Sequence, residues 1–263
     1  MRVKPKKQLG QHFLNDEHIA YDISETISGR YMPASHPEWG DLPVVEVGPG
    51  MGVLTKYLID SQRDVTAIEL DHESVEYLAK VYPALRVVEA DFLRLDLSTI
   101  YKGEFALIGN YPYNISSQIF FKVLEDRDKI PVVTGMLQKE VAERICSRPG
   151  SKVYGILSVL LQTWYNCEYL FNVEPHVFTP PPKVRSGVLR LTRNDRKELP
   201  CDPAFFKRVV KTAFGQRRKT LRNSLSTLIE PGSPVLSSRF MTERPERLSV
   251  EEFIELAQLL QKQ

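Results

Sequence analysis

The feature that most constrains the fold is a regular alternation of apolar runs and amphipathic segments between residues 43 and 146. Short apolar runs bounded by turn residues predict buried strands, and apolar spacing of three to four residues predicts helices. The predicted strands are 43–47, 65–70, 86–90, 105–108 and 132–137, and the predicted helices are 52–61, 74–81, 115–125 and 139–146. Strands separated by helices in this way indicate βαβ units and a mostly parallel sheet. The predicted fold class is therefore α/β, with helices on both faces of the sheet.

The pattern changes towards the C-terminus. A helix over 155–165 and strands over 167–173 and 187–192 are followed, from about residue 195, by predicted helices only, over 203–214, 218–228 and 249–261. The last helix begins with a capping box, Ser249 with Glu252. We predict a first domain over 1–194, which opens with a basic arm over 1–14 and a helix capped by Asn15, and a small all-helical domain over 195–263.

Composition excludes several classes of protein. No apolar stretch approaches the roughly 20 residues that span a bilayer, so no membrane association is expected. The first residues carry charges with no apolar core behind them, which argues against a secretory signal. The three cysteines are odd in number and form no CxxC pair, and the five histidines are scattered. These features predict a cytoplasmic protein without a metal site.

Charge is distributed unevenly along the chain. The formal net charge is only +2, yet residues 183–222 hold thirteen lysines and arginines against three acidic residues. The arm over 1–14 adds four basic residues and no acidic one. Segregated positive charge of this kind indicates a polyanionic partner.

A glycine loop follows the first predicted strand, in the sequence Glu46-Val-Gly-Pro-Gly-Met-Gly52. A dinucleotide-binding loop would need a third glycine at position 53, where this chain has Val53. Pro49 also removes one N–H from a loop that would cradle a pyrophosphate. The loop therefore suits a ligand without phosphates that lies close to the backbone of Gly48 and Gly50.

Two carboxylates follow the next two predicted strands. An acid after the second strand, here Glu69, can hold ribose hydroxyls, as in dinucleotide folds. An acid after the third strand, here Asp91, can accept a hydrogen bond from the exocyclic amine of adenine. Either residue alone is more often a helix cap or a surface residue, but together with the glycine loop they predict a nucleoside pocket.

The fourth predicted strand ends in the sequence Gly109-Asn-Tyr-Pro-Tyr113. Pro112 prevents the strand or a helix from continuing, so the loop is rigid. The amide oxygen of Asn110 and the carbonyl of Tyr111 can accept hydrogen bonds from an exocyclic amine, and Tyr113 can stack on the ring that carries it. The alternative is a strand-to-helix turn in which Asn110 caps local N–H groups and the tyrosines pack.

Five motifs follow one another along the chain: Gly10-Gln-His-Phe-Leu-Asn15, the glycine loop, Ile68-Glu-Leu-Asp71, Gly109-Asn-Tyr-Pro-Tyr113 and Phe178-Thr-Pro-Pro-Pro-Lys-Val184. In this order they resemble the motifs of the ribosomal RNA adenine dimethyltransferases of the KsgA type. The resemblance implies a Rossmann-like methyltransferase domain and dimethylation of small-subunit ribosomal RNA with S-adenosylmethionine during ribosome biogenesis. It implies that the cofactor site is lined by His12, Leu14, Gly48, Gly50, Glu69, Asp91 and Asn110. One departure is Tyr111, where the family usually has an aliphatic residue; the carbonyl that we expect to act is unchanged.

The remaining expectations concern RNA. A target base must leave its stack to reach the pocket, and we expect Tyr113 on one of its faces and Phe178 on the other. Arg217, Arg218, Lys219 and Arg222 are predicted to contact phosphates, because helical RNA is recognised mostly by shape and backbone. The expected partner is small-subunit ribosomal RNA in an immature particle, bound by a monomer.

Three other functions remain open on the residues alone. They are an RNA-binding assembly or transcription factor without turnover, an NAD-dependent oxidoreductase, and a methyltransferase of large-subunit ribosomal RNA or DNA. Intact Asn110, Glu69 and Asp91 argue against the first, and Pro49 and Val53 against the second. The third shares the pocket, so only the resemblance of the Phe178 segment and the C-terminal helices speaks against it.

Overall fold

A computed structural model describes residues 3–263, so Met1 and Arg2 of the predicted basic arm lie outside the described residues. The chain divides into two compact units. Among the described residues, the first unit comprises 3–142 and Asn166–Arg193, and the second comprises Glu143–Tyr165 and Asn194–Gln263. The sequence prediction, which ended the first domain at residue 194, placed residues 143–165 in the first domain, whereas in the structure they belong to the second unit.

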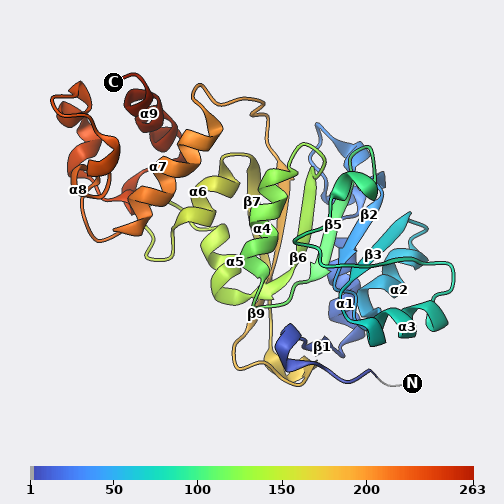
Figure 1. Cartoon of the computed structure of the whole chain (residues 1–263). Helices are drawn as coiled ribbons and strands as arrows, with labels where there is room; N and C mark the ends of the chain where they lie inside the picture. The colour runs from blue at the N-terminus through green and yellow to red at the C-terminus, as the bar shows by residue number, and fades with distance from the viewer. Residues whose placement is uncertain (1–2) are drawn as a thin grey trace. The chain divides into compact units, whose positions relative to one another are not determined.

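A seven-stranded sheet forms the centre of the first unit (Figure 1). Its order is β4 (Arg86–Glu89), β3 (Val65–Glu69), β2 (Val44–Val47), β5 (Ala106–Asn110), β6 (Val132–Gln138), β9 (Ser186–Arg193) and β7 (Tyr165–Val173). The pairs from β4 to β6 are parallel, and β9 runs antiparallel to β6. The prediction of a mostly parallel sheet is confirmed, and its strands lie within one or two residues of the predicted ranges.

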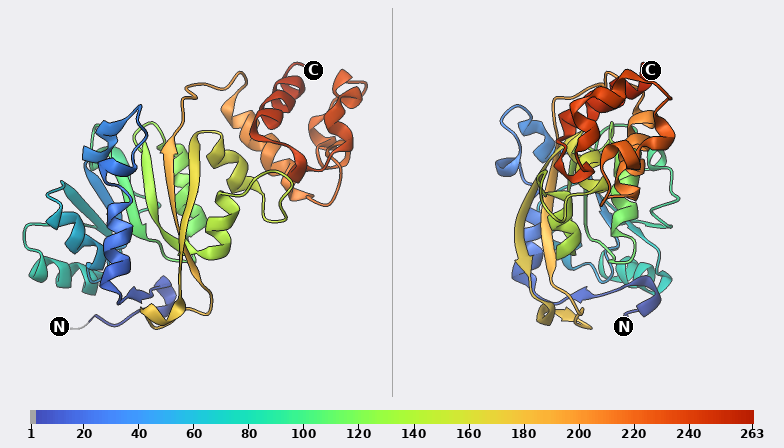
Figure 2. Two further views of the ribbon diagram at one scale, coloured as in Figure 1. Left: turned by 180° about the vertical axis from the view of Figure 1, so that it is seen from behind. Right: turned by 90° about the vertical axis from the view of Figure 1, so that its left-hand side faces the viewer.

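Helices cover both faces of this sheet. The helix α4 (Ser116–Glu125) lies before the sheet in Figure 1, whereas α1 (Glu17–Glu25) lies before it in the rear view of Figure 2. The other helices that follow its strands are α2 (Val53–Asp60), α3 (His72–Val81) and α5 (Lys139–Ile145). Side chains of α1 and α2 form one apolar core with alternate residues of the strands, among them Ile23, Leu54, Val44, Ala106 and Ile108.

The start of α1 corrects one prediction. Its cap is Asp16, whose carboxylate accepts hydrogen bonds from the N–H groups of His18 and Ile19. Asn15 instead turns to the proline-rich segment, where its side chain donates to Thr179 and its N–H to the carbonyl of Val177. Asn15 is recruited elsewhere because β1 (Phe13–Leu14) pairs with β8 (Phe178–Thr179) in a separate two-stranded sheet.

The second unit is helical. It contains α6 (Ile156–Gln162), α7 (Pro203–Gly215), α8 (Leu221–Ser224) and α9 (Val250–Gln261). Residues 143–165 belong to this unit because α6 packs against α7 and α9. The predicted capping box is present, with Ser249 and Glu252 each bonded to the other's N–H. The helix predicted over 218–228 is reduced to α8 and a following 3-10 turn, because Lys219 closes a turn onto Gln216 and Thr220 begins the helix anew.

The parallel strands position the site. The loops after β2, β3, β4 and β5 all leave the same edge of the sheet, where open α/β folds bind their ligands. None of the helices found between residues 3 and 263 is long and apolar enough to cross a membrane.

Candidate active site

A cavity of about 210 Å³ lies at the carboxyl edge of the parallel strands. Four strand-to-helix loops and the N-terminal segment line it, with the residues 8–14, 46–51, 53–54, 68–70, 90–93 and 110–115. Three carboxylates belong to this lining, those of Glu46, Glu69 and Asp91, whereas none of its described residues is lysine or arginine. The cavity therefore favours a ligand with positive charge and offers no cation to a pyrophosphate.

The glycine loop turns through positive backbone angles at its glycines. Gly48 and Gly50 have φ values of 66° and 57°, in the left-handed region that favours glycine. A side chain on Gly50 would begin 2.9 Å from the ring of Phe13, so the loop and the N-terminal segment are in close contact. The loop thus brings bare backbone to the cavity wall.

Glu69 connects the glycine loop to the end of β3. Its carboxylate accepts hydrogen bonds from the N–H groups of Gly50, Leu70 and Asp71, at 3.0, 2.8 and 2.8 Å. Burial raises the pKa of Glu69, and these three hydrogen bonds oppose the rise. Glu69, the residue predicted to bind ribose hydroxyls, therefore lies in the cavity, and its carboxylate also holds the glycine loop in place.

A second carboxylate, Glu46, lies deeper and was not among the predicted site residues. It is 1% exposed, and the hydroxyl of Thr55 donates to it at 2.6 Å. Burial raises the pKa of Glu46 to about 7, and the nearby Glu69 acts in the same direction.

The loop after β4 brings Asp91 to the cavity. Its Oδ1 accepts from the N–H of Leu93 at 2.9 Å, which holds the carboxylate in the turn. Phe92 is buried, and with Leu93 it adds apolar surface beside this carboxylate. Across the loops, Leu70 also lines the cavity although its side chain is 54% exposed. Sequence reasoning missed Leu70, Phe92 and Leu93, although each directly follows or lies close to a predicted strand-end acid.

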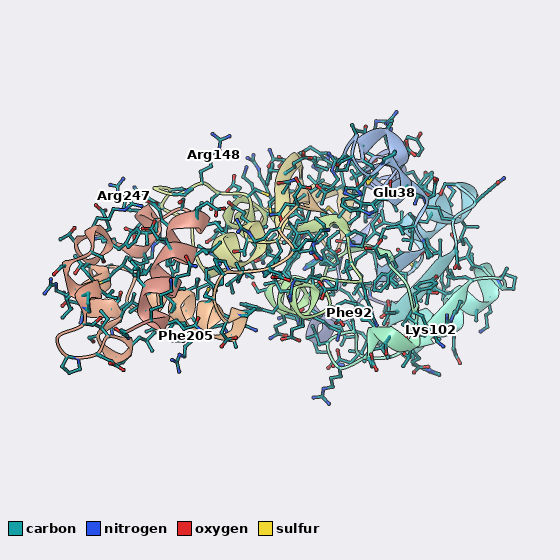
Figure 3. The ribbon with its side chains drawn as sticks, turned by 90° about the horizontal axis from the view of Figure 1, so that it is seen from above. Glu38, Phe92, Lys102, Arg148, Phe205 and Arg247 are labelled. Carbon is teal, nitrogen blue, oxygen red and sulfur yellow. The ribbon has the colours of Figure 1, made fainter. Side chains whose placement is uncertain are left out.

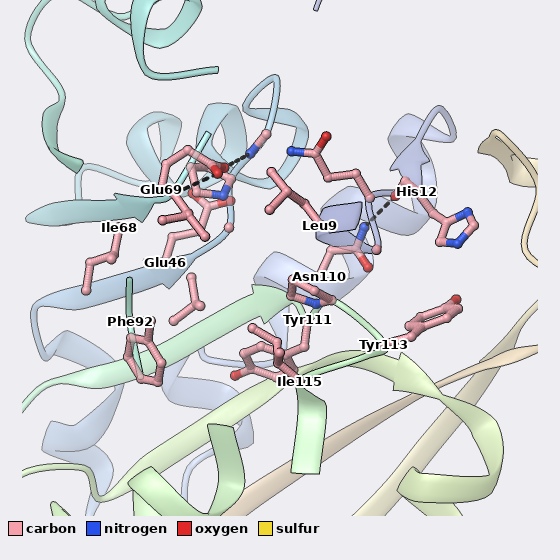
Figure 4. A pocket seen from close by; sticks show the side chains of 18 of the residues that line it. Leu9, His12, Glu46, Ile68, Glu69, Phe92, Asn110, Tyr111, Tyr113 and Ile115 are labelled. Atoms are coloured by element: carbon pink, nitrogen blue, oxygen red, sulfur yellow. Dashed lines mark hydrogen bonds between the residues drawn. The ribbon is translucent and has the colours of Figure 1, made fainter. Parts of the chain in front are cut away.

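Asn110 lies where the prediction requires it, in the cavity at the end of β5 (Figure 4). Its Nδ2 donates to the carbonyl of His12 at 3.1 Å, which attaches the N-terminal segment to the loop after β5. This bond directs the amide so that its oxygen remains available as an acceptor. No hydrogen bond to that oxygen is found among the described residues.

The side chain and the backbone of Tyr111 have separate surroundings. The ring is 1% exposed and packs edge-on against Phe120, and its hydroxyl donates to the carbonyl of Thr134 at 2.7 Å. Burial raises the pKa of this phenol well above its usual range. The N–H of Tyr111 donates to Met136, whereas its carbonyl accepts no hydrogen bond within residues 3–263. The carbonyl of Tyr111 can therefore accept a hydrogen bond from a ligand, as predicted, while its side chain packs in the core.

Tyr113 faces the N-terminal segment. Its ring stacks on the imidazole of His12, with centroids 5.3 Å apart and planes inclined by 30°, and its hydroxyl is hydrogen-bonded to Ser186. The Nδ1 of His12 lies 2.7 Å from the carbonyl of Pro180, which fixes the imidazole in turn. His12, Leu14 and Tyr113 all line the cavity, as expected.

Phe178 requires a correction. Its side chain is 2% exposed and belongs to the apolar core, and it is not part of the described cavity lining. The reason is the pairing of β8 with β1, in which Phe178 lies opposite the buried Leu14. The structure therefore does not bring Phe178 to the position of a second stacking partner for a base.

The N-terminal segment is also held from outside the cavity. Lys6 forms ion pairs with the buried carboxylate of Asp71 and, at 3.2 Å, with Glu73. Burial by itself would raise the pKa of Asp71, but hydrogen bonds from Lys6, Ser74 and Gln11 outweigh it and lower that pKa. Part of the predicted basic arm therefore neutralises the protein's own acids.

The predicted phosphate contacts lie in the second unit. Arg218, Lys219 and Arg222 are exposed, and Arg217 is partly buried. Arg217 donates to the carbonyl of Ser151 at 3.3 Å, and Arg222 donates to that of Leu236 at 2.8 Å. These two arginines therefore also connect loops within the unit.

Further cations surround this segment. The N–H of Gly150 donates to the main-chain carbonyl of Glu246, and the N–H of Leu221 donates to that of Glu243, which brings together the loops around 150, 220 and 245. Arg148 and Arg247 belong to these loops, and Figure 3 shows their side chains directed away from the ribbon.

In the whole described chain, no group of three histidine, cysteine, aspartate or glutamate side chains could hold a metal ion.

Comparison with known proteins agrees with the geometry. A family model described as "Ribosomal RNA adenine dimethylase" matches residues 2–262. The chain is 57% identical to "Ribosomal RNA small subunit methyltransferase A" of Parabacteroides distasonis, over 99% of this chain and 95% of that protein. It is 58% identical to the protein of the same name from Bacteroides thetaiotaomicron, over 97% and 93% of the two chains.

Two solved structures share the architecture. A dimethyladenosine transferase from Plasmodium falciparum superposes with a TM-score of 0.78 at 23% identity, over 95% of this chain and 98% of that one. The 23S rRNA methyltransferase ErmE superposes with a TM-score of 0.63 at 28% identity, over 94% and 99%. The first likeness supports the fold.

Proposed function

The chain belongs to the ribosomal RNA adenine dimethylase family, and from this premise we propose that the cavity at the edge of its sheet is the site of methyl transfer. The protein transfers methyl groups from S-adenosylmethionine to the exocyclic amine of adenines in small-subunit ribosomal RNA. The observation that carries the assignment of the site is the charge of its lining. The carboxylates of Glu69 and Asp91, with no described lysine or arginine in the lining, suit a sulfonium and an ammonium group and do not suit a dinucleotide.

The residues present fit this cofactor. Gly48 and Gly50 would lie against it, since their backbone is bare, and Glu69 would hold its ribose hydroxyls. Asp91 would accept from the amine of its adenine, whose ring would lie against the apolar Leu70, Phe92 and Leu93. His12 and Leu14 would close the cavity on the side of the N-terminal segment. When bound, the cofactor supplies an electrophilic methyl group on sulfur.

The chain's own groups prepare the nucleophile. The exocyclic nitrogen of adenine is weakly nucleophilic because its lone pair is delocalised into the ring. The amide oxygen of Asn110 and the carbonyl of Tyr111 would accept hydrogen bonds from its two N–H groups and thereby favour a pyramidal nitrogen. After transfer the nitrogen is cationic and acidic, so it can lose a proton to these acceptors or to water. Alignment supplies much of the remaining acceleration, roughly 7–11 kcal/mol for well-oriented reactants.

Tyr113 would stack on the everted base, contributing about 1–3 kcal/mol. A second methylation needs the same acceptors, because a monomethylated amine still carries one hydrogen. The buried position of Phe178 leaves the other face of the base without the partner that was expected.

The second unit would bind the RNA backbone. The basic segment carries Arg217, Arg218, Lys219 and Arg222. The neighbouring loops around residues 150 and 245 carry further arginines. We propose that the substrate is an immature small-subunit particle during ribosome biogenesis in the cytoplasm, and that the enzyme acts as a monomer. The uneven distribution of charge along the chain supports the RNA contact, because proteins recognise helical RNA mainly through its phosphate backbone and shape and not through its bases.

One assay tests the assignment. Labelled S-adenosylmethionine is offered with immature small subunits, large-subunit ribosomal RNA and DNA, and the modified base is identified. We expect label in dimethyladenosine of the small subunit. Label in large-subunit RNA or DNA alone would contradict the substrate, and absence of label from all three would contradict the activity.

A further inference from the structure

We propose that Ser186 is a positioning residue for methyl transfer, whose hydroxyl fixes the ring of Tyr113 for stacking on the target adenine. The inference rests on the proposed role of Tyr113 in the active site. It assigns a function to a residue that lies outside the cavity lining and is not among the predicted site residues.

The hydrogen bond joins a residue of a loop to a residue of the central sheet. Tyr113 lies in the loop after β5, whereas Ser186 is the first residue of β9 and is fully buried. Antiparallel pairing with β6 continues through Gln138, directly opposite Ser186. The serine hydroxyl therefore has a position set by the central sheet, and it transmits that position to the tyrosine hydroxyl.

A second restraint acts on the face of the same ring. His12 covers one face of Tyr113, and its Nδ1 donates to the carbonyl of Pro180 at 2.7 Å. One contact thus fixes the hydroxyl end of the ring and the other fixes its plane. A base that stacks on the face of Tyr113 away from His12 would then meet the ring at an orientation that does not need to be found during binding.

The hydroxyl has no other role that the structure supports. Burial raises the pKa of the Tyr113 phenol, so it stays protonated near neutral pH and does not act as a base. Its hydrogen bond to Ser186 is the only one that the described residues give to this hydroxyl. The bond is accordingly a means of orientation.

The test is a double-mutant cycle with Ser186→Ala, Tyr113→Phe and the two combined. Single-turnover methylation of immature small subunits is measured at saturating S-adenosylmethionine, together with the Kd of the cofactor. Each single variant should lower the rate constant by roughly three- to tenfold, as expected for one orienting hydrogen bond, with the cofactor Kd changed less than about twofold. The double variant should be no slower than the slower single variant, because the same bond is lost in all three.

Controls keep the result interpretable. Ser24→Ala removes another buried serine hydroxyl of the first unit, which donates to the main-chain carbonyl of Tyr21, and should leave the rate unchanged. Tyr113→Phe removes the bond without altering the buried strand, so it decides the matter if Ser186→Ala does not fold. A wild-type rate for folded Tyr113→Phe or Ser186→Ala would overturn the inference, and so would rate losses that multiply in the double variant. If the wild-type protein methylates no small subunits, the proposed function itself fails.

Discussion

The ring of Tyr111 occupies the space that a side chain on Gly135 would need. A Cβ at residue 135 would stand 2.7 Å from this ring and 2.2 Å from the carbonyl oxygen of Gly109. Gly135 has a φ of 147°, and the adjacent carbonyl of Thr134 accepts the hydroxyl of Tyr111. Tyr111, which stands where the resembled family usually has an aliphatic residue, is therefore accommodated by Gly135 on the neighbouring strand.

Gly135→Ala should strongly destabilise the protein. The new methyl group would collide with backbone and ring atoms that are both fixed, so we expect a free energy of unfolding lower by at least about 2 kcal/mol in denaturant titrations. Gly103→Ala is the control, because nothing lies within 4 Å of its Cβ, and it should change stability by less than about 0.5 kcal/mol. Equal stability of the two variants would refute the close packing.

Tyr111→Phe should affect stability and spare catalysis. It removes the buried hydrogen bond from the phenol to the carbonyl of Thr134, at a cost of about 0.5–1.5 kcal/mol in the free energy of unfolding. The peptide carbonyl of residue 111 remains, so the rate of methyl transfer should stay within about threefold of wild type. A large loss of rate in a folded Tyr111→Phe protein would mean that the phenol itself acts in the reaction.

Asn110→Ala should reduce turnover much more than cofactor affinity. Loss of one oriented polar group at a reacting centre costs about 100-fold or more in rate. Cofactor Kd should rise only modestly, through the lost bond from Nδ2 to His12. Single-turnover rates and equilibrium binding separate the two effects, and Asn166→Ala, at an exposed position of β7, is the control. Near wild-type methylation by Asn110→Ala would contradict the assigned role.

Glu46 should make stability depend on pH. Burial raises its pKa to about 7, so the folded protein retains a proton that the unfolded chain releases near pH 4.5. The native state binds more protons between these values, and stability therefore falls as pH rises through this range, by about 3 kcal/mol. Urea denaturation of cofactor-free protein from pH 5 to 8 measures this fall.

Glu46→Gln should remove that part of the pH dependence, because the amide cannot ionise and can still accept from Thr55. Glu38→Gln, at an exposed carboxylate, serves as the matched control and should keep the wild-type slope. If Glu46→Gln and wild type lose stability in parallel, Glu46 is ionised in the folded protein at neutral pH.

The basic segment should give RNA binding a steep dependence on salt. Arg218→Ala and Lys219→Ala should each weaken binding and reduce the salt slope by about one, without loss of stability. Arg217→Ala and Arg222→Ala should in addition lower stability by about 1 kcal/mol, because their side chains bond to Ser151 and Leu236. Lys102→Ala, an exposed lysine of the first unit, should leave the slope unchanged. A slope that none of the four substitutions alters would exclude this segment from the interface.

Sequence patterns predicted the centre of the sheet well because β2, β5 and β6 are mostly apolar runs that are buried on both faces. The strand-end residues Glu69, Asp91 and Asn110 were found for the same reason, since parallel strands end at one edge. The position of Phe178 could not be predicted, because its burial depends on a two-residue pairing with Phe13–Leu14, more than 160 residues away in sequence. The contact of Tyr111 with Gly135 similarly joins two strands that sequence periodicity describes separately.

The N-terminal segment has a practical consequence for work with this protein. Residues 8–14 form part of the cavity wall, and Lys6 fastens the chain just before them to Asp71 and Glu73. An affinity tag fused ahead of this segment would place foreign residues a few positions from the wall and compete with that attachment. A tag placed after α9 would avoid this conflict, and enzyme preparations that carry the two tags should differ in cofactor affinity.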